Sequence, residues 1–125
     1  MAMNVLIVDD SSTMRKIVLR NLKQTGIDLG EVFQAGDGQE ALGILEENTV
    51  HMILSDWNMP NMDGLGLVQA VRANDAWKNI RIVMITTEGG DAKVQEAIAA
   101  GANGYVKKPF TADDLEKELA PAAAA

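Results

Sequence analysis

The 125-residue sequence has no cysteine and no long apolar run. Without cysteine the chain can form no disulfide, thiolate nucleophile or zinc-thiolate site. Its apolar runs reach only four or five residues, whereas a membrane-spanning helix needs roughly 20. The N-terminus also lacks the basic region and apolar stretch of a secretory signal. We therefore expect a cytoplasmic protein without a membrane partner.

Positive charge is scarce as well. The chain has 11 Lys and Arg against 18 Asp and Glu, which gives a formal net charge of −7. A surface that binds nucleic acid needs clustered Lys and Arg, so we expect no nucleic-acid partner. Solubility explains most of the acidic residues, but those at the ends of apolar runs need a separate account.

Five short apolar runs alternate with helical patterns along the chain. The runs are Val5–Val8, Val32–Phe33, Met52–Leu54, Ile82–Ile85 and Tyr105–Val106. Continuous apolar runs are typical of strands that are covered on both faces. Five βα units in succession predict an α/β fold, with a doubly wound parallel five-stranded sheet and right-handed crossovers.

The helical patterns predict several local features. Capping residues around Asp37 and Thr111 indicate helix starts. The fourth helix is expected to carry Val94, Ala97 and Ile98 at helical spacing on its apolar face. Pro121 is expected to end the last helix and to leave residues 121–125 as a frayed tail. We expect residues 1–125 to form one domain, which buries roughly two-thirds of its unfolded surface.

Chemically active side chains follow four of the five predicted strands. Asp9 and Asp10 follow the first run and Asp56 the third, while Thr86 and Lys108 follow the fourth and fifth. Ligands of open α/β sheets bind at the carboxyl ends of the strands, where these side chains should meet. Three carboxylates in one pocket repel each other unless a cation is present. Oxygen ligands without His or Cys favour magnesium.

Each of these residues also has a simpler explanation. The two acids after the first run could cap the next helix, although Ser11 and Ser12 could do so too. Asp56 could be a loop acid, Thr86 a strand-end hydrogen bonder and Lys108 a solvated surface lysine. Their joint placement is what favours a site.

The segments around these residues resemble a response-regulator receiver domain, and most closely the stand-alone chemotaxis regulators of the CheY kind. The segments that carry the resemblance are Val8–Asp10, Ser55–Pro60, Met62–Gly64, Ile85–Thr86 and Tyr105–Phe110. The likeness extends over essentially the whole chain. It implies a flavodoxin-like fold with strand order 2-1-3-4-5.

The resemblance implies a role for each acidic residue of the predicted site. Asp56 would be the phosphoacceptor, and a histidine kinase would be the phosphodonor. Mg²⁺ would be held by Asp10, Asp56 and the backbone carbonyl of Asn58. Asp9 would lie in the same pocket and act mostly through water.

The resemblance also implies how the signal is read. Lys108 and Thr86 would contact the phosphoryl group, and Tyr105 would move between exposed and buried positions in response. A face with Val94, Tyr105 and Lys107 would bind an output protein such as a flagellar motor switch protein. We further expect a monomer, and possible reversal of the switch by a phosphatase.

A phosphatase of the haloacid dehalogenase type also uses an aspartate nucleophile, magnesium, Thr and Lys, but places an acid where this chain has Asn58. We therefore expect no enzyme beyond self-phosphorylation and autodephosphorylation. The receiver pattern leaves no room for a DNA-binding domain. A phosphorelay intermediate, or a regulator of a pathway other than chemotaxis, remains open, because Lys107 and Glu118 depart from the residues usual on the output face.

Overall fold

A computed structural model describes residues 2–57, 59–86, 91–108 and 110–123, with the backbone alone at residues 86, 91–94 and 120–123. The strands are β1 (Met3–Val8), β2 (Leu29–Ala35), β3 (Met52–Asp56), β4 (Arg81–Thr86) and β5 (Gly104–Lys107). The helices are α1 (Ser12–Gln24), α2 (Gly38–Glu47), α3 (Gly64–Arg72), the 3₁₀ turn η1 (Asp75–Trp77), α4 (Asp91–Ala100) and α5 (Ala112–Ala123).

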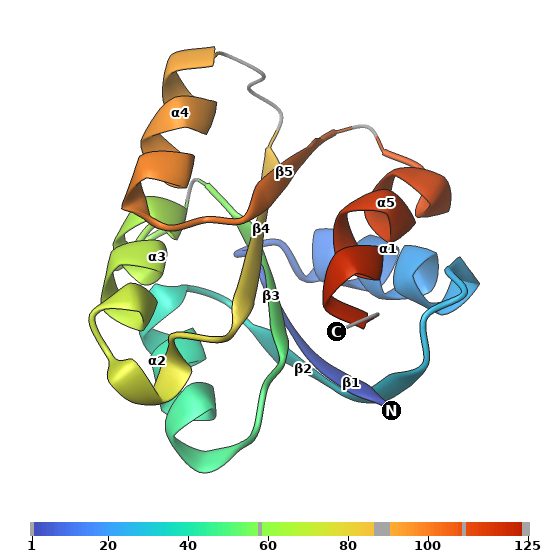
Figure 1. Cartoon of the computed structure of the whole chain (residues 1–125), viewed down its shortest axis with the longest axis horizontal. Helices are drawn as coiled ribbons and strands as arrows, with labels where there is room; N and C mark the ends of the chain where they lie inside the picture. The colour runs from blue at the N-terminus through green and yellow to red at the C-terminus, as the bar shows by residue number, and fades with distance from the viewer. Residues whose placement is uncertain (1, 58, 87–90, 109, 124–125) are drawn as a thin grey trace.

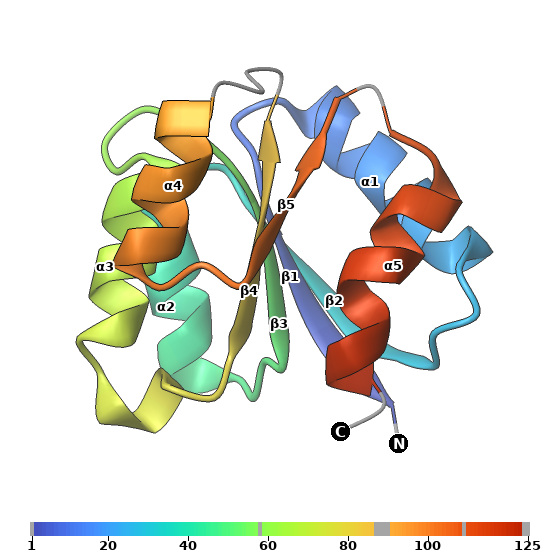
Figure 2. The same ribbon diagram turned by 45° about the horizontal axis from the view of Figure 1, so that its top comes forward.

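The five strands form one parallel sheet in the order β2-β1-β3-β4-β5. Helices α1 and α5 cover one face, and α2, α3 and α4 cover the other (Figures 1 and 2). Sequence analysis predicted this doubly wound architecture and strand order, and the structure confirms both. None of the helices in the described part of the chain is both long and apolar enough to cross a membrane.

The two faces of the sheet carry separate cores. In β1, Leu6 and Val8 face the α2–α4 side, while Val5 and Ile7 face the α1–α5 side. This alternation follows from the two-residue period of a strand. Because both faces are covered, both sets must be apolar, which explains the unbroken apolar runs in the sequence.

The helix starts show how local sequence sets the element boundaries. Ser11 caps α1, and its Oγ accepts a hydrogen bond from the Met14 amide (3.2 Å). Asp37 caps α2 by accepting from the Glu40 amide (2.8 Å). At α5, Thr111 and Asp114 exchange side-chain-to-amide bonds in a capping box. The two predicted starts, at Asp37 and Thr111, are therefore confirmed.

Two helix predictions were wrong. Ala97 is buried, but Ile98 is 46% exposed, because it lies about 100° further around the helix, on a side that the rest of the protein does not cover. The side chain of Val94 lies outside the described part. Helix α5 extends to Ala123 and includes Pro121. Proline removes one amide donor there, and since the helix ends two residues later, little of the hydrogen-bond ladder depends on it. Fraying of the tail stays a prediction.

Arg72, the last residue of α3, fastens three segments together. Its Nε donates to the Gly101 carbonyl (2.9 Å), just after α4. Its Nη1 donates to the Lys78 carbonyl (3.1 Å) and its Nη2 to Asn103 Oδ1 (2.9 Å). Gly101 itself has φ +119°, a backbone conformation that favours glycine. The carboxyl end of α4 is thereby tied to α3.

Candidate functional site

The candidate site lies where β1, β3 and β5 end. Val8 pairs with Ser55 in the sheet register, so Asp9 and Asp56 leave neighbouring strands at the same level. Together with Asp10, they offer carboxylate oxygens that all lie within 4.8 Å of one another. This grouping agrees with the sequence prediction for the three acids.

Lys108 enters this acidic cluster from the end of β5. Its Nζ lies 3.4 Å from Asp9 Oδ2 and 3.4 Å from Asp56 Oδ1. The lysine side chain is only 14% exposed, so these ion pairs are poorly screened by water. Lys108 is therefore a member of the site and not a solvated surface lysine.

Asp9 also shapes the turn that leads into α1. Its side chain is buried, and Oδ1 accepts a hydrogen bond from the Ser11 amide (2.9 Å). Its carbonyl oxygen accepts from Arg15 Nη1 (2.6 Å). Asp10, in contrast, is exposed, and Ser11 supplies the helix cap. Neither acid caps α1, and Asp10 is left available to a ligand.

Asp56 is held in a defined orientation at the end of β3. Its Oδ1 accepts from the Trp57 amide (2.9 Å) and faces Lys108. No donor among the described residues contacts Oδ2, so this oxygen is the one available for new bonds. Burial of the side chain raises the pKa of Asp56, and the nearby charge of Asp9 adds to the rise, while Lys108 opposes it. The Lys108 ammonium thus does not fully offset the effect of burial on the pKa of Asp56.

The cluster fits a hard divalent cation. Its donors are all carboxylate oxygens. Magnesium prefers such oxygen ligands, whereas zinc and copper are usually bound by His or Cys. The raised pKa of Asp56 indicates a carboxylate that would gain from a further positive charge. Within the described residues, no other three acidic or histidine side chains bring their ligand atoms within 4.8 Å of one another. The predicted carbonyl ligand of Asn58 lies outside the described residues.

Gly64 fixes the chain that follows Asp56. Its amide donates to the Trp57 carbonyl (2.9 Å), which closes the base of the loop between β3 and α3. A Cβ atom at this position would overlap the backbone carbonyl of Asp56 and the methyl group of Met84. Glycine is therefore required so that α3 can begin against the end of β3.

The remaining predicted site residues lie on β5 and at the end of the neighbouring strand β4. Tyr105 is 42% exposed and Lys107 is exposed, because β5 is an edge strand with alternating buried and exposed positions. Thr86 ends β4 in register with Lys107, but its side chain lies outside the described part.

Sequence analysis did not predict Arg15, whose guanidinium bonds to the carbonyl oxygen of Asp9. The only signal in the sequence was its place one helical turn after Ser11.

Comparison with known proteins identifies the family of this chain. The family model described as "Response regulator receiver domain" matches residues 5–120. The chain is 48% identical over 118 residues to the chemotaxis protein CheY1 of Helicobacter pylori, covering 94% of each sequence. It is 47% identical to a chemotaxis protein CheY homolog of Campylobacter jejuni, covering 94% of this chain and 89% of that one.

A solved structure is also similar. The chemotaxis response regulator CheY4 of Vibrio cholerae has a TM-score of 0.86 and 40% identity, covering 98% of this chain and 99% of its own. The family model spans nearly all of the chain, and the sheet order and the acidic cluster with Lys108 are those expected from the resemblance. The chain thus belongs to the response-regulator receiver family.

Proposed function

We propose that this chain is a phosphorylation-activated switch of a chemotaxis two-component system, which accepts a phosphoryl group on Asp56. The observation that carries the proposal is the joint placement of Asp9, Asp10, Asp56 and Lys108 at one edge of the sheet. The similarity to chemotaxis proteins over most of the chain supports the pathway.

The chemistry follows from the two oxygens of Asp56. Oδ1 is held by the Trp57 amide and Lys108, which leaves Oδ2 to attack phosphorus. An O–P bond forms as the P–N bond of a phosphohistidine donor breaks, and the histidine leaves with the electron pair. The product is an acyl phosphate, and attack of water on phosphorus later restores the carboxylate and releases phosphate. Such transfer depends mainly on positioning and charge stabilisation.

Each neighbour of Asp56 has a part in that stabilisation. Lys108 lies close enough to turn from the carboxylates to a phosphoryl oxygen. Mg²⁺ would be held by Asp10 and Asp56, with the carbonyl of Asn58 and with Asp9 in the same pocket, and would neutralise charge on the transferred group. No acid stands two residues after Asp56, so we propose a signalling protein and not a phosphatase acting on other substrates.

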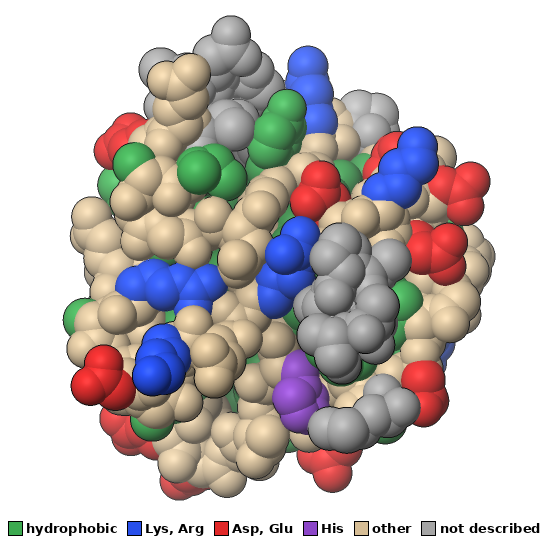
Figure 3. Space-filling model, viewed as in Figure 1, with side chains coloured by type: hydrophobic (Ala, Val, Ile, Leu, Met, Phe, Trp, Pro, Cys, Tyr) green, Lys and Arg blue, Asp and Glu red, His purple; other side chains and the backbone are tan. Residues whose placement is uncertain are grey.

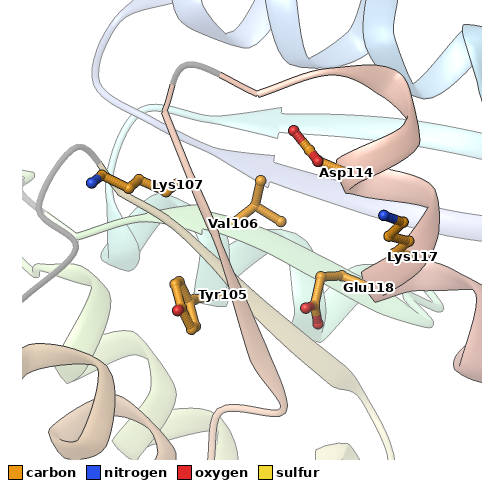
Figure 4. A pocket seen from close by; sticks show the side chains of 6 residues that line it. All are labelled: Tyr105, Val106, Lys107, Asp114, Lys117 and Glu118. Atoms are coloured by element: carbon orange, nitrogen blue, oxygen red, sulfur yellow. The ribbon is translucent and has the colours of Figure 1, made fainter. Parts of the chain in front are cut away.

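Output would leave through the surface over β5 and α5. Six residues line a pocket there: Tyr105, Val106, Lys107, Asp114, Lys117 and Glu118 (Figure 4). Lysine and arginine side chains stand along the middle of this face, among hydrophobic and acidic ones (Figure 3). The exposed ring of Tyr105 supplies an apolar anchor.

The charges of this pocket favour an acidic partner. Asp114 accepts from the Thr111 amide (2.9 Å), and Glu118 lies 3.8 Å from Arg81, so both acids are engaged within the protein. Lys107 and Lys117 have no partner among the described residues. The lining of the pocket thus includes two ammonium groups and an aromatic ring, which suits an acidic amphipathic peptide such as a motor switch protein would present.

Labelling with a small phosphodonor tests the proposed function. Acetyl phosphate with Mg²⁺ should add one phosphoryl group to the wild type, measured as intact mass. Asp56→Asn should take up none, because the nucleophilic oxygen is replaced by an amide nitrogen. Undiminished labelling of Asp56→Asn would refute the assignment of the phosphoacceptor.

A further inference from the structure

The amino end of α2 is bonded to the loop that follows the phosphoacceptor strand. Asp37, the N-cap of α2, uses Oδ1 to accept from the Glu40 amide (2.8 Å). Its Oδ2 accepts from Asn61 Nδ2 (2.8 Å), in the loop between β3 and α3. One carboxylate thus serves both its own helix and a loop 24 residues away.

A second bond runs beside the first. The Gly38 amide donates to the Met62 carbonyl (3.1 Å). A Cβ atom at Gly38 would come within 2.6 Å of Met62 Cγ, so the helix end and the loop are in close contact. We call these two contacts, Asp37 with Asn61 and Gly38 with Met62, the α2 clamp.

The clamp holds a strained turn. Asn61 has φ +65°, the one positive value at a non-glycine residue among those the structure describes. The Met62 amide donates to the Pro60 carbonyl (2.6 Å) across it. A three-residue turn with positive φ at its centre is the rarer form of the γ-turn. Such backbone strain persists only where surrounding contacts impose it, and strain of this kind is common at functional sites.

The clamped loop forms one wall of the candidate metal site. Met59, Pro60 and Asp63 line a surface pocket together with Asp10. The same loop starts directly after Asp56, and its base is closed by the Gly64 bond to the Trp57 carbonyl. The loop is therefore held at its base by the start of α3 and further along by the start of α2.

We propose that Asp37 and Asn61 are positioning residues, which hold the loop after Asp56 in the form that binds Mg²⁺ and receives the phosphoryl group. This inference rests on the proposed function. Neither residue touches the reacting atoms. Outer residues that orient a metal site commonly contribute about 10- to 100-fold to metal affinity, and a loop that must otherwise be ordered at each binding event binds less tightly.

The test uses two variants that spare the fold. Asn61→Gly removes the side-chain bond but adopts a positive φ without strain. Asp37→Ser keeps a capping hydroxyl for α2 and loses the second acceptor. Magnesium affinity is read from tryptophan fluorescence, and stability from thermal unfolding without metal. We expect about tenfold weaker Mg²⁺ binding in each variant, with an unfolding temperature for Asn61→Gly at or above that of the wild type.

Three comparisons make the result decisive. The double variant should bind Mg²⁺ no more weakly than either single variant, because one hydrogen bond is lost in all three. Excess Mg²⁺ should restore the rate of labelling by acetyl phosphate. The control is Asn74→Gly, which removes the cap of η1. Asn74 precedes the amino end of β4, whereas the site lies at the carboxyl ends of the strands, so this variant should leave Mg²⁺ affinity unchanged.

Two outcomes would overturn the inference: wild-type Mg²⁺ affinity in both variants, or losses that simply add in the double variant. Absence of Mg²⁺ binding and labelling in the wild type itself would instead refute the proposed function. The two failures are therefore distinguishable.

Discussion

Lys108 is shared between two carboxylates, at 3.4 Å from Asp9 and 3.4 Å from Asp56. A phosphoryl group on Asp56 would compete with both for the same ammonium. The lysine is therefore positioned to register the arrival of the new charge, since its contacts must change when the group is added. Sequence analysis predicted that Lys108 belongs to the site, but its equal sharing depends on the strand ends and was visible only in the structure.

Replacing Lys108 should separate phosphorylation from switching. Lys108→Ala should still be labelled by acetyl phosphate, because Mg²⁺ supplies much of the stabilisation of the transferred group. Its gain in affinity for the output partner on phosphorylation should be largely lost. Titrations of the phosphorylated and unphosphorylated forms of wild type and variant measure this gain. Equal gains in the two proteins would show that Lys108 does not couple the site to the output surface.

Asp56 should cost the unmodified protein stability. Its pKa is raised in the folded state, first by burial and also by Asp9, so the folded form binds the proton more tightly than the unfolded form. Stability is then lost as pH rises from the unfolded value near 3.8 through the folded pKa. Asp56→Asn keeps an oxygen for the Trp57 amide and removes the charge.

We therefore expect Asp56→Asn to raise the melting temperature at pH 7 by a few degrees. The difference should vanish below pH 3.8, where the carboxyl is protonated in both states. Thermal unfolding across this pH range, without Mg²⁺, measures it. A wild type that is the more stable protein at pH 7 would contradict the prediction.

Among the helices and strands, a prediction from the sequence was accurate where local residues decide the structure, and less so where tertiary contacts decide it. The central strands and the caps at Asp37 and Thr111 were predictable, because burial on both faces and capping bonds leave local signals. Strand β5 was read only as an apolar run at Tyr105–Val106. It is an edge strand, so Tyr105 points outward and Val106 inward. Which strand lies at the edge is set by topology and not by local sequence.

Helix α4 and the loop after β3 show the same limit. Ala97 and Ile98 looked alike as apolar positions, yet only packing against the sheet decides which one is buried. The bond from Asn61 to Asp37 joins residues 24 positions apart. Nothing in the local sequence around Asp37 or Asn61 indicates that the two side chains bond to each other. This part of the site could therefore not have been predicted from the sequence.

The fluorescence of Trp57 should report metal binding at the acidic cluster. Trp57 follows Asp56 directly, and its side chain is buried in the core. Mg²⁺ should change its fluorescence, and Asp10→Asn should weaken the apparent affinity about tenfold or more by removing an oxygen ligand. Trp77→Phe serves as the background, because Trp77 in η1 precedes β4 at the opposite edge. An unchanged titration for Asp10→Asn would remove that residue from the metal site.

At the scale of the whole molecule, the proposed phosphorylation site and the proposed output face lie on different parts of the surface that share β5. Lys108 enters the acidic cluster, while the neighbouring Lys107 lines the pocket with Tyr105. A change at the end of β5 therefore has a short covalent route to the output face. A ligand shifts such a switch only by its different affinity for the two states.

Output binding should depend on this face. Beryllofluoride with Mg²⁺, which mimics the phosphorylated state, should raise affinity for an acidic amphipathic peptide. Tyr105→Ala and Lys107→Glu should each remove most of that gain, by loss of the anchor and by reversal of charge. Calorimetry measures the affinities, and chemical-shift mapping locates the peptide. Shifts that spare β5 and α5 and cluster on α1 would favour a histidine phosphotransfer partner, as in a phosphorelay.

The bonds of Arg72 limit how α4 can respond. Its guanidinium ties Gly101, just beyond α4, and Asn103, just before β5, to the end of α3. Asn103 Oδ1 also accepts from the Ile82 amide (2.8 Å) in β4. Sliding α4 along its axis would break these bonds together, whereas tilting it about its carboxyl end would spare them. Helix α4 is thus built as a lever with its pivot at Gly101, and its displacement during signalling should grow with distance from that residue.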